Sequence, residues 1–387
     1  MMHIIDDGNM YMVAATWMLL AAISAGLAMR FKLAAALVEI IIGILAGNFI
    51  GLHTNAWIDF LAGFGSILLT FLAGAEIDPV VLRAQALPAT VLGAASFAAP
   101  ALAAGCYAIF VAHWTLDAAK IAGIAMSTTS VAVVYAVMVE SGLAQREFGQ
   151  LILAACFFTD LGTVVALGLL FANYNLWLVL LVICIVVSML VVPKLLPVVI
   201  DRTRPYVSEP ALRILFAIIF LLSAIATYAK SEGVLPAYFL GLACAGMMIA
   251  HRDVKRRLQT MAMTLLTPFY FLKAGTYILL RDAWQSIGLI AALFAVKVGA
   301  KVIGVLPLAR LLKFPQRDAN YLTMMMATGL TFGTISSLYG LTHHYIDQSQ
   351  YTALVTVVIL TAVVPTLIAQ ALFKPDVEPA EMESEVP

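Results

Sequence analysis

Long apolar runs recur along almost the whole chain, and their length constrains the fold more than any single motif does. A bilayer core of roughly 30 Å is crossed by a helix of about 20 apolar residues. The runs are continuously apolar, whereas the strands of a transmembrane barrel alternate. With 63% hydrophobic and 11% charged residues, the chain is therefore predicted to be an all-α polytopic membrane protein. About thirteen transmembrane helices are expected, at residues 10–29, 33–52, 56–75, 86–111, 118–139, 149–172, 175–199, 211–229, 234–250, 258–279, 284–309, 319–340 and 350–373.

The basic residues are distributed unevenly between the two sides of this predicted bundle. If the N-terminus lies outside, sixteen of the 22 Lys and Arg residues fall in cytoplasmic connections and three fall outside. Cytoplasmic loops carry such an excess, so we expect the N-terminus outside and the C-terminus in the cytoplasm. The remaining three, Lys273, Lys297 and Lys301, lie within predicted helices. The zero net charge hides this asymmetry and indicates no nucleic-acid partner.

One carboxylate, Asp160, lies near the middle of the predicted helix at 149–172, in the run CFFTDLGTVV. A charge at the bilayer centre costs about 2.5–3.5 kcal/mol on insertion scales, so a residue placed there is a candidate for function. The alternative is a structural carboxylate that joins two helices through a hydrogen bond. An unpaired buried carboxylate takes up a proton, and we therefore expect a basic or polar partner.

Two lysines offer such a partner. Lys297 and Lys301 lie four residues apart in the predicted helix at 284–309 and therefore share one face of it. Two ammonium groups on one stripe in lipid predict that at least one meets an acid or loses its proton. Both are candidate charge partners of Asp160.

Hydroxyl residues interrupt the predicted helix at 118–139, where the sequence at 127–130 is STTS. Hydroxyls can replace backbone hydrogen bonds where a helix unwinds, and their oxygens can bind a cation. A packing face of small residues is the alternative. The sequence ATGLTFGT at 327–334 is a matching interruption. Paired interruptions in two halves of a chain predict a transporter with a site near the middle of the membrane.

Four further charged residues are candidates for an access path or for structural roles. Glu39 lies one or two turns into its helix and could be an interfacial anchor or part of an ion entry path. Glu76 and Asp78 follow a predicted helix end and are expected to cap it or to attract cations at the cytoplasmic rim. Lys273 is expected to form a structural ion pair, with Glu39 or Glu232 as its partner.

Several of these runs resemble a known family when they are read in order. The run ALVEIIIGILAGNFIGL resembles the GEILAGILLGP-type second helix of the monovalent cation:proton antiporters, and FLAGAEIDPVVLR resembles their FxxGLExD segment. GIAMSTTSVAVVYAVMVESG is similar to their unwound helix, TDLGTVV to their ion-binding helix, and AKVIGVLPLARLL to their basic helix. The similarity covers about residues 30–370. It is greatest to the second large family of these antiporters, which includes bacterial sodium/proton and potassium/proton exchangers.

The resemblance implies a sodium/proton antiporter fold, with inverted repeats and two crossing interrupted helices. It also implies a homodimer in a bacterial cytoplasmic (inner) membrane. Residues 374–387 are rich in Pro and Glu and are expected to form a disordered acidic cytoplasmic tail. The implied domains are scaffold helices in residues 1–85 and 206–280, transport helices in 86–172 and 281–373, and a linker helix in 173–205.

The resemblance assigns roles to individual residues. Asp160 matches the ion-binding aspartate and Lys301 the membrane lysine, which would pair with the empty carboxylate. The crossing would place Asp160 beside Thr129 and Ser130. A transported Na⁺, K⁺ or Li⁺ would bind ionised Asp160 with help from hydroxyl oxygens of Thr159, Thr128, Thr129 and Ser130, in competition with a proton.

Thr159 is a departure from the family pattern. Electrogenic members carry a second Asp at this place, so electroneutral exchange is the simpler expectation. Lys301 is more typical of the electrogenic group and points the other way. The family pattern gives no role to Lys297, and the resemblance implies no cofactor.

Two other transport functions remain as alternatives. A cation channel would require a filter-like repeat of carbonyl or charge rings, and none is seen in the sequence. A sodium-coupled solute symporter on a related fold would be expected to carry an anion-binding Arg within a helix. An intramembrane enzyme is not expected, because the six histidines fall at loops or predicted helix ends and no HExxH motif is present.

Overall fold

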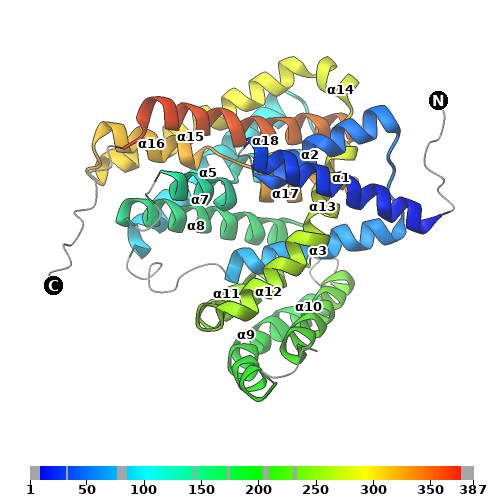
Figure 1. Ribbon diagram of the computed structural model, residues 1–387. Coiled ribbons are helices and arrows are strands. Elements are labelled where there is room, and N and C mark those ends of the chain that lie inside the picture. The colour runs from blue at the N-terminus through cyan, green and yellow to red at the C-terminus, as the bar shows by residue number, and fades with distance from the viewer. Residues whose placement is uncertain are drawn as a thin grey trace.

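The fold is described from a computed structural model of the chain. It describes residues 9–31, 34–75, 85–141, 143, 146–171, 175–203, 209–229 and 233–375. Throughout these ranges the regular structure is helical (Figure 1). The α-helices are α1 (Met10–Phe31), α2 (Ala35–Leu45), α3 (Ala56–Ala75), α5 (Ala86–Phe110), α6 (Leu116–Ser127), α7 (Val131–Glu140), α8 (Glu147–Leu170), α9 (Leu176–Thr203), α10 (Pro210–Tyr228), α11 (Val234–Ala250), α12 (Arg252–Met261), α13 (Thr267–Thr276), α14 (Leu280–Gln285), α15 (Ile287–Leu311), α16 (Gln316–Met326), α17 (Thr331–Thr342) and α18 (Gln348–Ile368). Three π-helical segments, η1 (Ala46–Ile50), η2 (Ala262–Leu266) and η3 (Ala369–Phe373), continue α2, α12 and α18.

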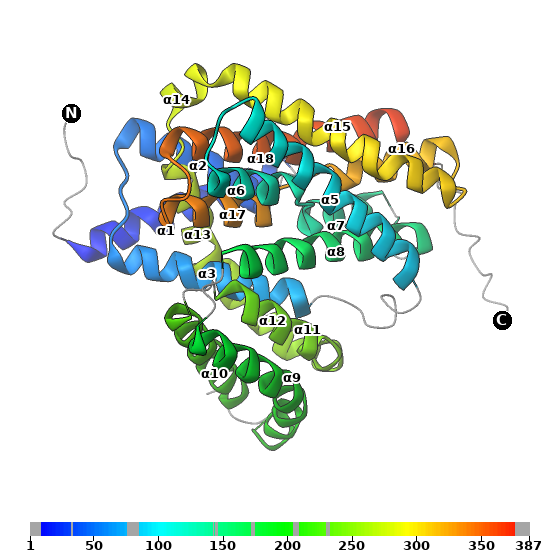
Figure 2. The same cartoon turned by 180° about the vertical axis from the view of Figure 1, so that it is seen from behind.

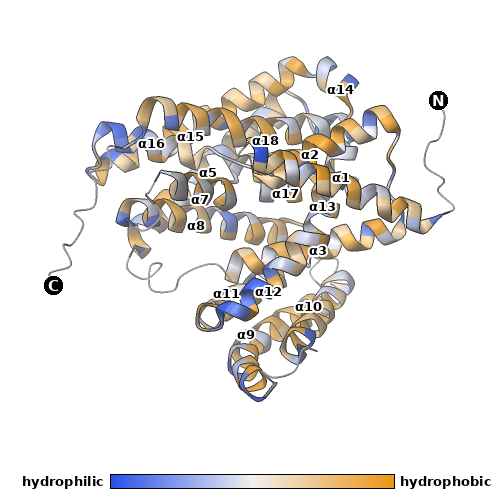
Figure 3. Cartoon of the chain, viewed as in Figure 1, coloured by the Kyte–Doolittle hydropathy of each residue, from blue (hydrophilic) through white to orange (hydrophobic). Residues whose placement is uncertain are grey.

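The lengths of these helices fit a membrane protein. Within the described ranges, eight helices are long and apolar enough to cross a bilayer, and Ala35–Ile50 and Val234–Ala250 are shorter apolar helices. Apolar residues cover most of the bundle, and hydrophilic residues gather at α12 and α16 (Figure 3). The predicted all-α membrane fold is confirmed, whereas the number of thirteen crossings stays a prediction.

Helix boundaries follow the hydropathy pattern closely, with one clear difference. The helix predicted at 258–279 begins earlier in the structure. Helix α12 starts at Arg252, and it continues through η2 into α13. Hydropathy alone misses these turns, since Arg252, Lys255 and Arg256 are polar although the backbone is helical.

Two groups of helices have the same internal order. In each group a long helix is followed by an interrupted helix and then by another long helix: α5, α6–α7 and α8, and again α15, α16–α17 and α18. The first long helices of the two groups, α5 and α15, pack together (Figure 2). A Cβ atom on Gly304 would lie 2.7 Å from the Cβ of Ala99, so small residues permit this close approach.

Glycines also bring α3 and α11 into backbone contact. A Cβ on Gly241 would clash with the carbonyl oxygen of Phe71, and one on Gly74 would clash with that of Tyr238. Helix α13 packs on α2 in the same way, where Gly43 and Gly275 face backbone atoms of the opposite helix. These contacts build a tightly packed unit of α2, α3, α11 and α13, and α9 and α10 cover its outer side (Figure 1).

We expect Gly241→Ala to lower the thermal midpoint of the detergent-solubilised protein, because the added methyl group would press on backbone rather than on a movable side chain. Overpacking of this kind typically costs about 1–3 kcal/mol. Gly63→Ala on α3 is the matched control, since a Cβ there meets nothing within 4 Å and alanine favours the helix by about 1 kcal/mol. Thermal unfolding of both variants is measured by tryptophan fluorescence. Equal unfolding midpoints for the two variants would contradict the packing argument.

Candidate functional site

The predicted interruption in the first group is present between α6 and α7. The backbone leaves the helix at Thr128, which is extended at φ −64° and ψ 150°. Hydroxyls bond to the carbonyls of the preceding turn: Ser127 Oγ donates to Ile124 O at 2.7 Å and Thr128 Oγ1 to Ala125 O at 3.1 Å. Ser130 Oγ accepts weakly from the Val133 amide at 3.5 Å. The hydroxyl run therefore supports an unwound segment, as predicted from its composition.

The second interruption separates α16 from α17 and crosses the first. Thr129 Oγ1 donates to the carbonyl oxygen of Met326, the last residue of α16, at 2.9 Å. Glycines make the crossing possible: a Cβ on Gly333 would lie 3.0 Å from Thr128 Oγ1 and 3.2 Å from Ala125 O. The prediction of two crossing interrupted helices is confirmed.

Helix α8 carries Asp160 past this crossing. One turn before Asp160, Cys156 Sγ lies 3.8 Å from Met326 Sδ. Asp160 itself is 3% exposed, and its Oδ1 is buried without a hydrogen-bond partner among the described residues. A carboxylate oxygen left open in a low-dielectric interior is costly unless a proton or a cation completes it. Asp160 is thus the strongest candidate for a binding residue.

Lys301 reaches the first interruption from α15. Its Nζ donates to Ser96 Oγ on α5 at 2.8 Å, to Ser127 O at 2.8 Å and to Thr129 Oγ1 at 3.0 Å. The carbonyl of Ser127 belongs to the last residue of α6, where the partial negative charge of a helix end favours a cation. Three acceptors satisfy this buried ammonium group fully.

The expected ion pair between Lys301 and Asp160 is not formed in the structure. Within the ranges described, no ion-pair contact joins these two side chains. The difference arises because the acceptors of the unwound segment and Ser96 occupy all three hydrogens of the ammonium group. Ser96 escaped the sequence reasoning, although a lone serine in an alanine-rich helix was an available signal.

Lys297 lies one turn before Lys301 and is also fully buried. It comes close to the second interruption, since a Cβ on Gly329 would clash with its Nζ. That Nζ has no hydrogen-bond partner in the described part of the chain. The two lysines on one face therefore differ sharply: Lys301 holds the crossing together, whereas Lys297 is buried beside it without compensation.

The remaining predicted site residues are Thr159, Glu39, Glu76 and Asp78. Thr159 is buried beside Asp160, but its hydroxyl donates to Cys156 O of its own helix at 2.6 Å. Glu39 is buried, 4% exposed, with Oε2 unpartnered in the described structure, and its two possible roles, as an interfacial anchor or in an ion entry path, stay predictions. Glu76 and Asp78 lie outside the described residues.

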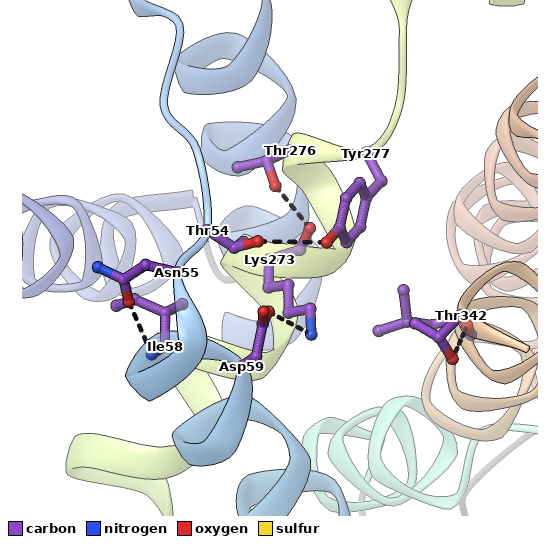
Figure 4. Close-up of polar contacts among 9 residues, drawn as sticks. Thr54, Asn55, Ile58, Asp59, Lys273, Thr276, Tyr277 and Thr342 are labelled. Atoms are coloured by element: carbon purple, nitrogen blue, oxygen red, sulfur yellow. Dashed lines mark hydrogen bonds and ion pairs between the residues drawn. The ribbon is translucent and has the colours of Figure 1, made fainter. Parts of the chain in front are cut away.

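The structural ion pair predicted for Lys273 exists, but its partner is different. Lys273 Nζ lies 2.7 Å from Asp59 Oδ1, and the pair joins α13 to the first turn of α3 (Figure 4). Close by, the hydroxyls of Thr54, two residues before α3, and Tyr277, directly after α13, are in contact at 3.2 Å. Glu39 is not the partner, and Glu232 lies outside the described residues. Asp59 was missed because only the packing of α13 on α3 brings it to Lys273.

The contrast between the two lysines predicts opposite effects on stability. Lys301→Met removes bonds from a charged donor, each worth about 1.5–3 kcal/mol, and leaves Ser127 O open in the interior, so it should lower the thermal midpoint strongly. Lys297→Met removes an uncompensated buried charge and should be neutral or stabilising. Thermal unfolding of both variants in detergent checks this, with Lys194→Met, at an exposed lysine of α9, as the control. A larger loss for Lys297→Met would contradict the assignment.

Comparison with known proteins is consistent with this geometry. The chain is 25% identical to a Na⁺/H⁺ antiporter of Enterococcus hirae over 366 residues, which cover 89% of this chain and 93% of the relative. It is 24% identical to the Na⁺/H⁺-K⁺ antiporter GerN of Bacillus cereus, with coverage of 87% and 89%. The solved structure of the sodium proton antiporter MjNhaP1 from Methanocaldococcus jannaschii shares the fold, with a TM-score of 0.67 at 16% identity, over 92% of this chain and 94% of that one.

A family model decides the relationship. The model described as the transmembrane sodium/hydrogen exchanger matches residues 17–374, which include both interruptions, Asp160, Lys297 and Lys301. The match extends over nearly the whole of the 387-residue chain. The chain therefore belongs to the sodium/hydrogen exchanger family.

Proposed function

We propose that this protein exchanges a monovalent cation, Na⁺ or K⁺, for H⁺ through competition at Asp160. The observation that carries the proposal is the buried, unpartnered oxygen of this carboxylate beside two crossing interrupted helices. The names of the relatives support the substrates, since both antiporters compared above are named for Na⁺/H⁺ exchange and one also for K⁺.

The chemistry of the exchange follows from charge. Protonated Asp160 is neutral, and Asp160 with a bound monovalent cation is also neutral, so either form can cross the membrane interior. The bare carboxylate cannot, because a buried charge without a partner is costly. A dehydrated alkali cation prefers oxygen ligands, and besides Asp160 the hydroxyl oxygens of Thr128, Thr129, Ser130 and Thr159 are the candidates. Since one carboxylate holds either ion, each cycle exchanges one for the other.

Lys301 would act on this exchange through its position. Its ammonium group is tied to Ser127 O and Thr129 Oγ1, so it fixes the unwound segment that offers hydroxyl oxygens. A positive charge on Lys301 would stabilise the ionised, empty Asp160 carboxylate more than its protonated or cation-bound forms. A cation arriving at Asp160 would then compete with the field of Lys301 rather than break a direct ion pair.

Alternating access would come from movement of one part of the chain against the other. We assign residues 86–172 and 281–373 to the moving transport domain and residues 1–85 and 206–280 to the scaffold, with 173–205 as the linker. The glycine contacts among α2, α3, α11 and α13 support a rigid scaffold, and site residues carried by interrupted helices fit transport. The protein would work as a homodimer in a bacterial inner membrane, with its N-terminus outside and its C-terminus in the cytoplasm.

Asp160→Asn should abolish exchange, because an amide can neither release a proton nor balance a cation. The measurement is the pH change inside proteoliposomes after separate pulses of Na⁺, K⁺ and Li⁺, with empty liposomes as background. Exposed Glu147→Gln on the same helix makes the same chemical change outside the site and should leave the rate unchanged. Exchange retained by Asp160→Asn would reject the proposal.

Electroneutral exchange predicts a rate that is insensitive to membrane potential. An elementary charge moved through 100 mV changes the free energy by about 2.3 kcal/mol, so an electrogenic cycle would respond severalfold. We expect equal initial Na⁺/H⁺ exchange rates in proteoliposomes clamped at 0 and about −100 mV. A clear acceleration by either sign of potential would show that each cycle moves net charge, which exchange at Asp160 alone does not account for.

A further inference from the structure

Tyr238 of α11 contacts α8, the helix that carries Asp160. The side chain is fully buried, and its hydroxyl donates to the carbonyl oxygen of Phe157 at 3.3 Å. Phe157 precedes Asp160 by three residues in α8.

The ring of Tyr238 contacts two phenylalanine rings near the candidate site. It stacks on Phe157 of α8, with centroids 5.8 Å apart and planes at 12°. It also meets the ring of Phe332 edge to face, at 6.2 Å and 82°. Phe332 is the second residue of α17, directly after the second interruption. The three rings therefore lie across the ion-binding helix and the start of an interrupted helix.

The backbone of Tyr238 is held by a different set of helices. Its carbonyl oxygen lies against Gly74 of α3, and one turn later Gly241 faces the carbonyl oxygen of Phe71. Backbone contacts of this kind leave no room for α11 to slide on α3. Tyr238 would thus stay with α3, whereas Phe157 and Phe332 would move with α8 and α17.

We propose that Tyr238 is a positioning residue whose ring, together with Phe157 and Phe332, forms an aromatic barrier that separates Asp160 from water. This proposal rests on the proposed exchange function and on movement of α8 and α17 against the α3–α11 pair. With the three rings in contact, Asp160 is enclosed, as its 3% exposure records. Movement of α8 and α17 past Tyr238 parts the rings and opens the carboxylate to one side of the membrane.

The ring, and not the hydroxyl, is the important part of this side chain. The hydroxyl makes one long bond to a carbonyl whose helix already offers it an amide partner, whereas the ring makes both aromatic contacts. Tyr238→Phe should therefore keep the barrier, and Tyr238→Ala should remove it. Tyr238→Leu is an intermediate variant that keeps apolar volume and serves if the alanine variant does not fold.

Native Cys156 reports the state of the barrier. It is fully buried next to Phe157 and one turn from Asp160, so its reaction with a small membrane-permeant maleimide measures access to the site. The test uses full-length protein in proteoliposomes with Cys106, Cys184 and Cys244 replaced by serine. Phe64→Ala is the matched control, because Phe64 of α3 stacks on Phe220 of α10 at 4.4 Å, away from Asp160.

We expect Tyr238→Ala to speed maleimide labelling of Cys156 by roughly tenfold or more, since the ring contacts with Phe157 and Phe332 are lost. Tyr238→Leu should give a smaller increase, and Tyr238→Phe and Phe64→Ala should label like the parent protein. The Na⁺ concentration for half-maximal exchange should stay within about twofold in all of these variants, because the ring does not bind the cation.

Two results would contradict the proposal of an aromatic barrier. Parent-like labelling in Tyr238→Ala or, if that variant does not fold, in Tyr238→Leu would show that the ring does not restrict access. Rapid labelling in Tyr238→Phe would show that the hydroxyl, and not the ring, closes the site. Asp160→Asn in the same background separates the two proposals: retained exchange there rejects the ion-binding role of Asp160, whatever the labelling rates of the Tyr238 variants.

Discussion

The structure depends on two unwound segments that satisfy each other in a place without water. Within a bilayer, every backbone group must find a partner in the protein, so a broken helix is tolerated only where other groups complete it. Here Thr129 donates to the last carbonyl of α16, and Lys301 donates to the last carbonyl of α6. Each interruption is therefore stable only because the other one, or a lysine from α15, lies against it.

The hydrogen bonds between the two interruptions also determine which polar groups lie near Asp160. Thr129 and the Lys301 ammonium group use their hydrogens on carbonyl and hydroxyl oxygens of the crossing, and the carboxylate of Asp160 passes beside it with one oxygen left open. The polar groups that stabilise the break are thus the groups that can attract an ion. Lys297 lies buried at the other break, and its Nζ has no hydrogen-bond partner among the described residues.

The surrounding helices have a different physical basis. Glycine contacts bring α3 against α11 and α2 against α13 at backbone distance, and the Lys273–Asp59 pair ties α13 to α3. Packing of this kind resists deformation, whereas the crossing is held by a few directed hydrogen bonds. A rigid frame beside a polar, interrupted core is suited to movement of one against the other, and Tyr238 lies where the two meet.

The sequence by itself determined the membrane-spanning helices, the two interruptions and the residues that do not belong in lipid. Predicted runs such as 86–111 and 234–250 agree with α5 and α11 within one residue, because hydropathy and breakers are local properties of the chain. Asp160, Lys297 and Lys301 were found by the same local reasoning, since a charge in an apolar run is costly wherever the run packs. Only the tertiary structure decided which groups meet. Lys301 donates a hydrogen bond to Ser96, 205 positions away in the sequence, and forms no ion pair with Asp160. Lys273 pairs with Asp59 and not with Glu39. The rotation and depth of each helix decide these partners, and both depend on packing that no single segment encodes.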